Sequence, residues 1–229
     1  MTENKKQQTF NTSVLQKEEY FKSHWNKVYS RNEIDKLGWY EESPEPSLRL
    51  IKKCNLDKSA ILLNVGAGAS TLVDELLEDG YQNIIANDLS SNALEKLKLR
   101  IGSDKSRKVQ WVVDDLTQPN ELNDLAQVDL WHDRAVLHFF NDEKEQDTYF
   151  KLLRKLVKPN GFVIIATFNL GGATKCSGLP VHRFDENMLQ KKLGKSFMLI
   201  EAFNYTYTMP SGETRQYVYT LFQRINESI

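Results

Sequence analysis

The sequence predicts an α/β fold in which a mostly parallel sheet is covered by helices on both faces. Short apolar runs typical of buried strands alternate with helix-like stretches from about residue 60 to residue 168. Such alternation requires right-handed crossovers between parallel strands. Beyond residue 195 two β-rich runs are joined by Pro-Ser-Gly, which is typical of an antiparallel hairpin. We therefore expect a parallel sheet that a hairpin completes.

The composition is that of one globular domain. The chain has 229 residues, of which 40% are apolar and 27% charged, and its net charge is -1. Because basic and acidic residues balance, nucleic acid is a disfavoured partner. Cys54 and Cys176 lie far apart in the sequence, which predicts free thiols and no metal site. With no apolar run of about 18 residues and no hydrophobic leader, we expect a cytoplasmic protein and no membrane span.

The N-terminal part precedes the alternating region. Residues 1–13 are polar and predict a flexible tail, and residues 14–29 have helical periodicity with an aromatic-rich face. A loop follows, in which Pro44 and Pro46 suit the start of a second helix. We expect residues 14–56 to form a helical cap that closes as a lid over a core of residues 57–229.

The core elements follow in order. Strands are predicted at residues 60–65, 83–88, 108–115, 127–133 and 162–168, and helices at 70–80, 91–102, 142–161 and near 185–194. Ser70 can cap the first of these helices and Gly80 ends it. Pro159 and Gly161 are expected to stop the helix that begins at residue 142.

The loop after the first strand, residues 64–71, reads NVGAGAST. In open parallel sheets, ligands bind beyond the carboxyl ends of the strands. Gly66 and Gly68 allow a ligand to approach the backbone, and the next helix points free N–H groups at the same place. A dinucleotide-binding turn would have a third glycine where this chain has Thr71. A tight turn without a ligand remains an alternative.

Acidic residues at the ends of two strands narrow the choice of ligand. Asp88 ends the second strand, 20 residues after Gly68, where an acid accepts hydrogen bonds from a ribose diol. Asp114 and Asp115 end the third strand, where a carboxylate can accept a hydrogen bond from an adenine amino group. These acids would repel a pyrophosphate but not a cationic sulfonium. The pattern favours an adenosine-containing cation.

Five segments together resemble the class I S-adenosylmethionine-dependent methyltransferases: NVGAGAS, NDLS, VVDDLT, DLWHDRAVLHFF and LLRKLVKPNGFVIIATF. The resemblance covers about residues 20–225. It implies a Rossmann-like three-layer sandwich whose seven-stranded sheet includes an antiparallel last strand. It also implies S-adenosylmethionine as the cofactor and S-adenosylhomocysteine as the product.

The resemblance also implies which residues hold the cofactor. The methionine part would pass over Gly66, Ala67 and Gly68. The ribose would lie at Asp88 and Leu89, and the adenine at Asp115 and Leu116. Trp25 and Tyr40 would close over the ligand, because aromatic faces attract a sulfonium, although ordinary packing explains them equally well. The family usually has an acid at Asn64, so this position lacks the charge that attracts the ligand's ammonium.

Asp133 and His138 are the candidate catalytic residues. Asp133, Arg134 and Ala135 resemble the end of the fourth strand in thiopurine and METTL-type protein lysine methyltransferases. Asp133 would contact the cofactor and orient the acceptor or take its proton. The alternatives are an ion pair of Asp133 with Arg134 and a buried His138 satisfied by backbone groups.

The function that we expect is methyl transfer to a small molecule or a protein side chain, and the compact chain favours a small acceptor. Two other classes stay open. A non-catalytic S-adenosylmethionine-binding protein is favoured by Asn64 alone. A nicotinamide-dependent oxidoreductase would leave Asp115 and the closing hairpin unexplained.

Overall fold

The structure is a computed structural model that describes residues 2–225, with side chains from residue 17 onward. The helices are α1 (Thr2–Arg31), α2 (Glu45–Lys53), α3 (Leu72–Glu78), α4 (Ser91–Ser106), α5 (Glu143–Leu156) and α6 (Glu186–Leu193), with short 3-10 turns η1 (Ile34–Lys36), η2 (Glu121–Asp124) and η3 (Leu137–Phe139). The side chains of the predicted tail, residues 1–13, lie outside the described ones, and its flexibility stays a prediction, as does the domain division at residue 57.

The strands are β1 (Ile61–Val65), β2 (Asn83–Asp88), β3 (Val109–Val113), β4 (Val128–Arg134), β5 (Val157–Phe168), β6 (Lys175–Cys176), β7 (Leu179–Pro180), β8 (Phe197–Thr208) and β9 (Thr214–Arg224). In the described part of the chain, seven of them form one sheet in the order β3-β2-β1-β4-β5-β9-β8. Strands β1 to β5 pair in parallel, whereas β9 is antiparallel to both β5 and β8. The predicted mostly parallel sheet with an antiparallel last strand is confirmed.

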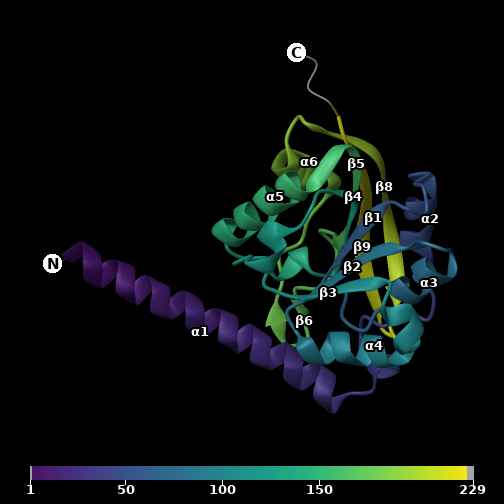
Figure 1. Ribbon diagram of the computed structural model, residues 1–229. Coiled ribbons are helices and arrows are strands. Elements are labelled where there is room, and N and C mark those ends of the chain that lie inside the picture. Colours follow the sequence, from purple (N-terminus) through teal and green to yellow (C-terminus); the bar gives the residue numbers. More distant parts are fainter. Residues whose placement is uncertain (1, 226–229) are drawn as a thin grey trace.

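Helices cover both faces of this sheet (Figure 1). Alternate residues of a strand point to opposite faces, and in β1 Leu62 packs with α2, α3 and α4 while Leu63 packs with α5 and α6. Both leucines are fully or almost fully buried. The three-layer sandwich expected from the sequence is therefore confirmed. Within residues 2–225, no helix has the length and apolar character needed to cross a membrane.

The largest error in the predicted boundaries concerns the end of α5. The helix expected over residues 142–161 ends at Leu156, and β5 begins at Val157, whose φ of -75° and ψ of 126° are extended. Pro159 disfavours a helical conformation in the residue before it, and Val157 pairs with Val128 of β4. The start of α5 is fixed by Asp142, which forms a capping box with Glu145.

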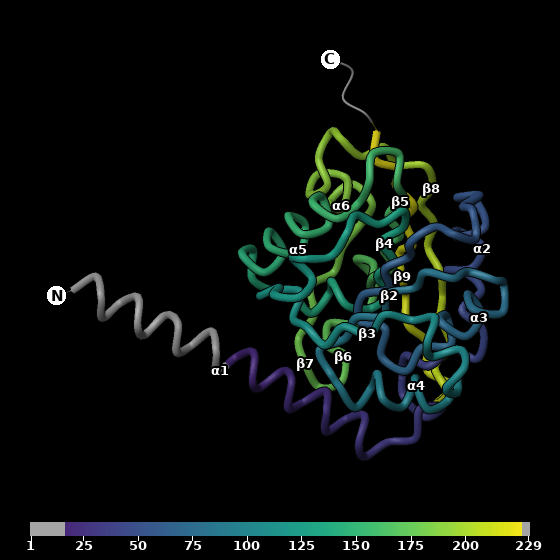
Figure 2. The backbone as a smooth tube through the Cα atoms, in the orientation of Figure 1, coloured from purple at the N-terminus to yellow at the C-terminus, as the bar shows by residue number. Residues whose placement is uncertain are grey.

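A short hairpin of β6 and β7 was not predicted. Its turn consists of Ser177 and Gly178, at φ of +50° and +79°. The hydroxyl of Ser177 lies 3.2 Å from His24 Nε2 of α1. The hairpin therefore contacts the side of α1 (Figure 2).

Candidate active site

The carboxyl ends of β1 to β4 open into one cavity of about 660 Å³. Helix α1 and the segment that leads from it to α2 supply the opposite wall. Eight of the predicted cofactor residues line this cavity: Trp25, Tyr40, Gly66, Ala67, Asp88, Leu89, Asp115 and Leu116. The structure thus brings together residues that are distant in the sequence, as the parallel sheet predicts.

Two positions of the loop after β1 require glycine. Gly66 and Gly68 have φ of +56° and +53°. A Cβ atom on Gly66 would lie 2.0 Å from Val136 Cγ2, and one on Gly68 would lie 2.3 Å from the hydroxyl oxygen of Tyr29. Gly68 itself is behind Tyr29 and does not line the cavity. Both the backbone conformation and the close neighbours exclude larger residues here.

Asp88 holds this loop in place. One carboxylate oxygen accepts a hydrogen bond from Gly68 N and the other accepts one from Ser90 N, each at 2.7 Å. Asp88 is 8% exposed, and its burial raises the pKa of the carboxyl to about 6 despite these donors. Asp88 lines the cavity, and each carboxylate oxygen, with one hydrogen bond from the protein, keeps an acceptor site for a hydroxyl group of a ribose.

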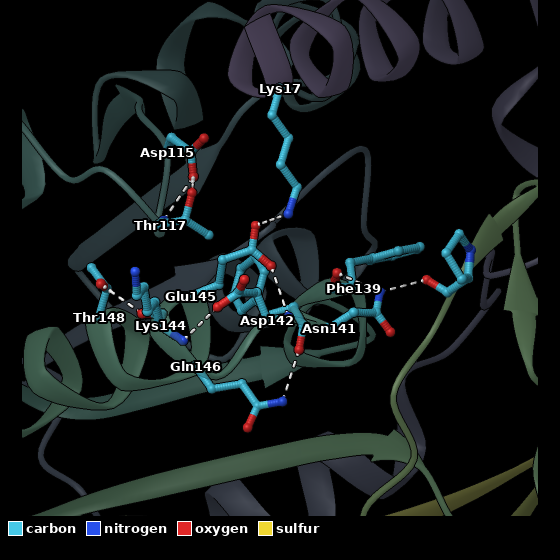
Figure 3. A network of polar contacts seen from close by, with 12 residues as sticks. Lys17, Asp115, Thr117, Phe139, Asn141, Asp142, Lys144, Glu145, Gln146 and Thr148 are labelled. Carbon is cyan, nitrogen blue, oxygen red and sulfur yellow. Dashed lines mark hydrogen bonds and ion pairs between the residues drawn. The ribbon is translucent and has the colours of Figure 1, made fainter. Parts of the chain in front are cut away.

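The end of β3 adds Asp114 and Asp115. Asp115 Oδ1 accepts hydrogen bonds from the backbone N and the hydroxyl of Thr117, at 2.7 and 2.8 Å (Figure 3). The charged residues that line the cavity are mainly acidic: Glu18, Glu41, Asp88, Asp114, Asp115, Asp142 and Glu145, against Lys17, Arg134 and Lys144. This balance favours a cationic ligand and opposes a pyrophosphate.

Asn64 is part of a buried chain of hydrogen bonds. Its Oδ1 lies 2.9 Å from His132 Nδ1, and His132 Nε2 lies 2.9 Å from the hydroxyl of Ser47. Burial, with a contribution from Arg134, lowers the pKa of His132 to about 3, so the imidazole is neutral. Among the described residues Asn64 Nδ2 has no partner. A ligand with an acceptor atom, such as a carboxylate oxygen, fits beside this donor.

Asp133 was expected at the reacting centre, but it faces the protein interior. It is 0% exposed and accepts hydrogen bonds from Val136 N, Leu137 N and the hydroxyl of Tyr149, at 3.0, 3.2 and 2.7 Å. It does not line the cavity. Its partners are backbone groups and a tyrosine and not Arg134. Asp133 therefore stabilises the η3 turn through these hydrogen bonds.

His138 also lies away from the cavity. Its ring stacks on Phe168, with centroids 4.4 Å apart, and burial lowers its pKa to about 3. In the described part of the chain neither ring nitrogen has a hydrogen-bond partner, so the expected satisfaction by backbone groups was wrong. A neutral imidazole buried against phenylalanine does not fit a catalytic acid or base.

Glu41 and Arg134 line the cavity beside β4, although the sequence had not predicted either of them as a site residue. Arg134 Nε lies 2.9 Å from Glu41 Oε2, and both side chains are largely buried. Burial raises the pKa of Glu41, and Arg134 opposes that rise. The only signal in the sequence was the position of Arg134 at a strand end, because nothing local links it to the Glu41 loop.

Aromatic residues complete the wall on the side of α1. Trp25 contacts Trp39 and Phe139 edge-on, with centroids 5.6 and 5.0 Å apart. Trp39 Nε1 donates a hydrogen bond to the hydroxyl of Tyr29 at 3.1 Å. Lys17 of α1 forms an ion pair with Glu145 at the start of α5 (Figure 3). Apolar and polar contacts therefore hold α1 against the η3 turn and the start of α5, on the other side of the cavity.

Comparisons with known proteins agree with this geometry. Residues 63–163 match the family model of a methyltransferase domain. The chain is 27% identical to EEF1A lysine methyltransferase 2 of Danio rerio over 161 residues, which cover 65% of this chain and 68% of that protein. A SAM-dependent methyltransferase from Anabaena variabilis has a similar structure, with a TM-score of 0.72 and 13% identity over 90% of this chain and 94% of its own. A further similar structure is the 1,6-didemethyltoxoflavin-N1-methyltransferase of Burkholderia thailandensis, with its substrate and S-adenosylhomocysteine bound, at a TM-score of 0.65 and 19% identity over 95% of this chain and 90% of its own.

The matched domain, the relative and the shared fold support the predicted class I S-adenosylmethionine-dependent methyltransferase. They likewise support S-adenosylmethionine as the cofactor, and a methyltransferase domain does not fit the alternative of a nicotinamide-dependent oxidoreductase. Among the described residues, no group of three or more side chains has the arrangement of a metal site.

Proposed function

We propose that S-adenosylmethionine lies across the carboxyl ends of β3, β2 and β1. The adenine lies beside Asp115 and Leu116, and the ribose at Asp88 and Leu89. The methionine part lies over the loop of residues 66–68, with Trp25 and Tyr40 above it. The order of these strands in the sheet supports this arrangement, since each part of the ligand meets the neighbouring strand.

The cofactor, when bound, supplies a methyl group activated by a positively charged sulfur. The chain's own residues align the donor and the acceptor and exclude water, which is most of what in-line methyl transfer requires. The observation that carries this proposal is Asp88, because its carboxylate fixes the glycine loop and the residue lines the cavity.

The acceptor that we propose is a nitrogen atom of a small molecule or of a protein side chain. Two similar proteins support nitrogen, one named as a lysine methyltransferase and one as an N1-methyltransferase. We also propose a cytoplasmic location, which rests on the sequence features given above and is checked by fractionating cells that express the protein.

Calorimetric titration with S-adenosylmethionine tests the proposed position of the ribose at Asp88. The pKa of Asp88 is about 6, and the ionised carboxylate is the better acceptor for ribose hydroxyl groups and the better partner for a cation. Affinity is therefore expected to fall about tenfold between pH 7.5 and pH 5. Asp88→Asn is expected to weaken binding by about 10- to 100-fold at pH 7.5 and to reduce the dependence on pH.

Asp104→Asn is the matched control, because Asp104 is an exposed acid whose partner is Arg107 on the surface of α4. This variant is expected to bind as the wild-type protein does. Equal affinities of the wild-type protein and Asp88→Asn at both pH values would place the ribose elsewhere.

A further inference from the structure

Glu41 is a buried carboxylate that the proposed cofactor arrangement leaves unused. Its side chain is 8% exposed, and the exposed part lines the cavity. Its backbone oxygen accepts a hydrogen bond from the hydroxyl of Thr71 at 3.0 Å, and its carboxylate meets Arg134. Glu41 is therefore tied both to the start of α3, just after the glycine loop, and to the end of β4.

The guanidinium of Arg134, which contacts Glu41, is itself held by surrounding protein groups. Its Nε lies 3.1 Å from the hydroxyl of Tyr219, and its Nη1 donates to Trp39 O at 2.9 Å. The guanidinium lies 5.0 and 5.2 Å from the ring centroids of Tyr207 and Tyr217. These contacts fix the guanidinium beside the Glu41 carboxylate, and among the described residues its Nη2 alone has no hydrogen-bond partner.

The position of this pair relative to the cofactor follows from the sheet. Strand β4 is the next strand after β1, and Val65 pairs with Asp133, one residue before Arg134. The loop at Gly66 approaches Val136, just beyond the end of β4. A ligand whose methionine part lies over Gly66 would therefore have the Glu41 carboxylate on its β4 side.

We propose that Glu41 is the acceptor-binding carboxylate and that it takes a protonated amine. This inference rests on the proposed function. The ammonium group donates a hydrogen bond to Glu41 and then transfers a proton to it. The neutral nitrogen forms the new C–N bond as the C–S bond breaks and its electron pair stays on sulfur. The methylated nitrogen keeps its positive charge as an ammonium group. The protonated Glu41 releases its proton to solvent.

The chemistry around Glu41 favours an amine over an anionic acceptor. A single hydrogen bond from Arg134 Nε leaves acceptor sites on the carboxylate, which need N–H donors. An acceptor with its own carboxylate or thiolate would meet like charge. Trp39 and Tyr40, on the same segment as Glu41, add aromatic surface that attracts a cation.

The test uses two cofactor analogues in which nitrogen replaces sulfur. One carries an aminoethyl arm in place of the methyl group, and the other carries a propyl arm of the same length. The wild-type protein is expected to bind the aminoethyl analogue about 10- to 100-fold more tightly than the propyl analogue. Glu41→Gln is expected to abolish this preference, and Glu41→Asp to restore part of it.

The matched control is Glu42→Gln, because Glu42 is the exposed neighbour of Glu41 and does not line the cavity. This variant is expected to keep the preference. S-adenosylhomocysteine is titrated in parallel, and failure of the wild-type protein to bind it would contradict the proposed function as a whole.

Two results would overturn the inference alone. In the first, the wild-type protein binds S-adenosylhomocysteine but does not prefer the aminoethyl arm, a comparison that needs no variant. In the second, Glu41→Gln weakens the binding of both analogues and of S-adenosylhomocysteine by the same factor. Glu41 would then bind the α-ammonium group that these ligands share.

Discussion

At the scale of single residues, two buried histidines of this protein differ in how their nitrogens are satisfied. His132 has Asn64 and Ser47 as partners, whereas His138 has none among the described residues. The pKa of each is about 3 in the folded chain and about 6.5 when unfolded. Since the folded pKa is lowered, the stability that each contributes is present above pH 6.5 and is lost as pH falls toward 3.

His138→Leu is expected to alter the acid sensitivity of the fold. At pH 5 the unfolded histidine is mostly protonated, which costs the folded state about 2 kcal/mol relative to pH 7.5. Leucine does not titrate and leaves no unpaired nitrogen, so the variant should gain about 2 kcal/mol over the wild-type protein between these pH values. Urea unfolding at both pH values measures the difference.

The comparison variant His132→Leu loses two buried hydrogen bonds. It is expected to be destabilised by about 1–3 kcal/mol at pH 7.5. If His138→Leu followed the wild-type pH profile instead, His138 would not be held neutral in the folded chain.

At the scale of elements, the parts of the site formed by continuous sequence were predictable. The glycine turn and Asp88 are close to strand ends, and their roles follow from strand order. Asp133 was misjudged because a position at a strand end does not say where the side chain turns. Ala135, at φ of +68°, reverses the chain so that Asp133 accepts hydrogen bonds from the turn that follows.

The pair of Glu41 and Arg134 was not predictable for a different reason. Its contact depends on how the segment after α1 crosses the end of the sheet, and this path is set by tertiary packing. The segment is held by contacts such as Trp39 O with Arg134 and Thr71 with Glu41 O. No periodicity within residues 32–44 encodes these distant partners.

The glycine loop and α1 are coupled through one contact, which a pair of substitutions can measure. Gly68→Ala places a methyl group against the hydroxyl of Tyr29 at a positive φ, so we expect a loss of about 1–3 kcal/mol of stability and weaker cofactor binding. Tyr29→Phe removes that hydroxyl. The double variant should therefore lose less stability than the two single losses added together, as chemical denaturation measures.

Gly80→Ala separates strain from contact. Gly80 has φ of +93°, and a Cβ atom added there would have no neighbouring atom within 4 Å, so its substitution adds backbone strain alone. No coupling with Tyr29→Phe is expected there. Strictly additive losses for Gly68→Ala and Tyr29→Phe would mean that the loop does not press against α1.

At the scale of the whole molecule, α1 joins regions that the sheet alone leaves separate. Lys17 reaches α5 through Glu145, His24 reaches the β6–β7 hairpin through Ser177, and Asn26 Oδ1 accepts a hydrogen bond from Ser90 at the start of α4. Trp25 and Tyr29 pack in one apolar cluster with Ala69 and Ala93. Because Lys17, Trp25 and Tyr29 line the cavity, we expect a ligand that leaves past α1 to displace some of these contacts.

Loosening α1 is therefore expected to speed ligand exchange more than it weakens the fold. An exposed ion pair contributes roughly 0–1 kcal/mol, so Lys17→Ala should raise the dissociation rate of S-adenosylhomocysteine by up to about fivefold. Stopped-flow tryptophan fluorescence measures this dissociation rate, because Trp25 and Trp39 line the cavity.

Added salt should speed dissociation from the wild-type protein but not from the Lys17→Ala variant. Lys58→Ala, which removes a partner of Asp79 away from the cavity, should leave the rate unchanged. Equal rates for Lys17→Ala and the wild-type protein at low salt would show that the ligand leaves by a path that does not displace this end of α1.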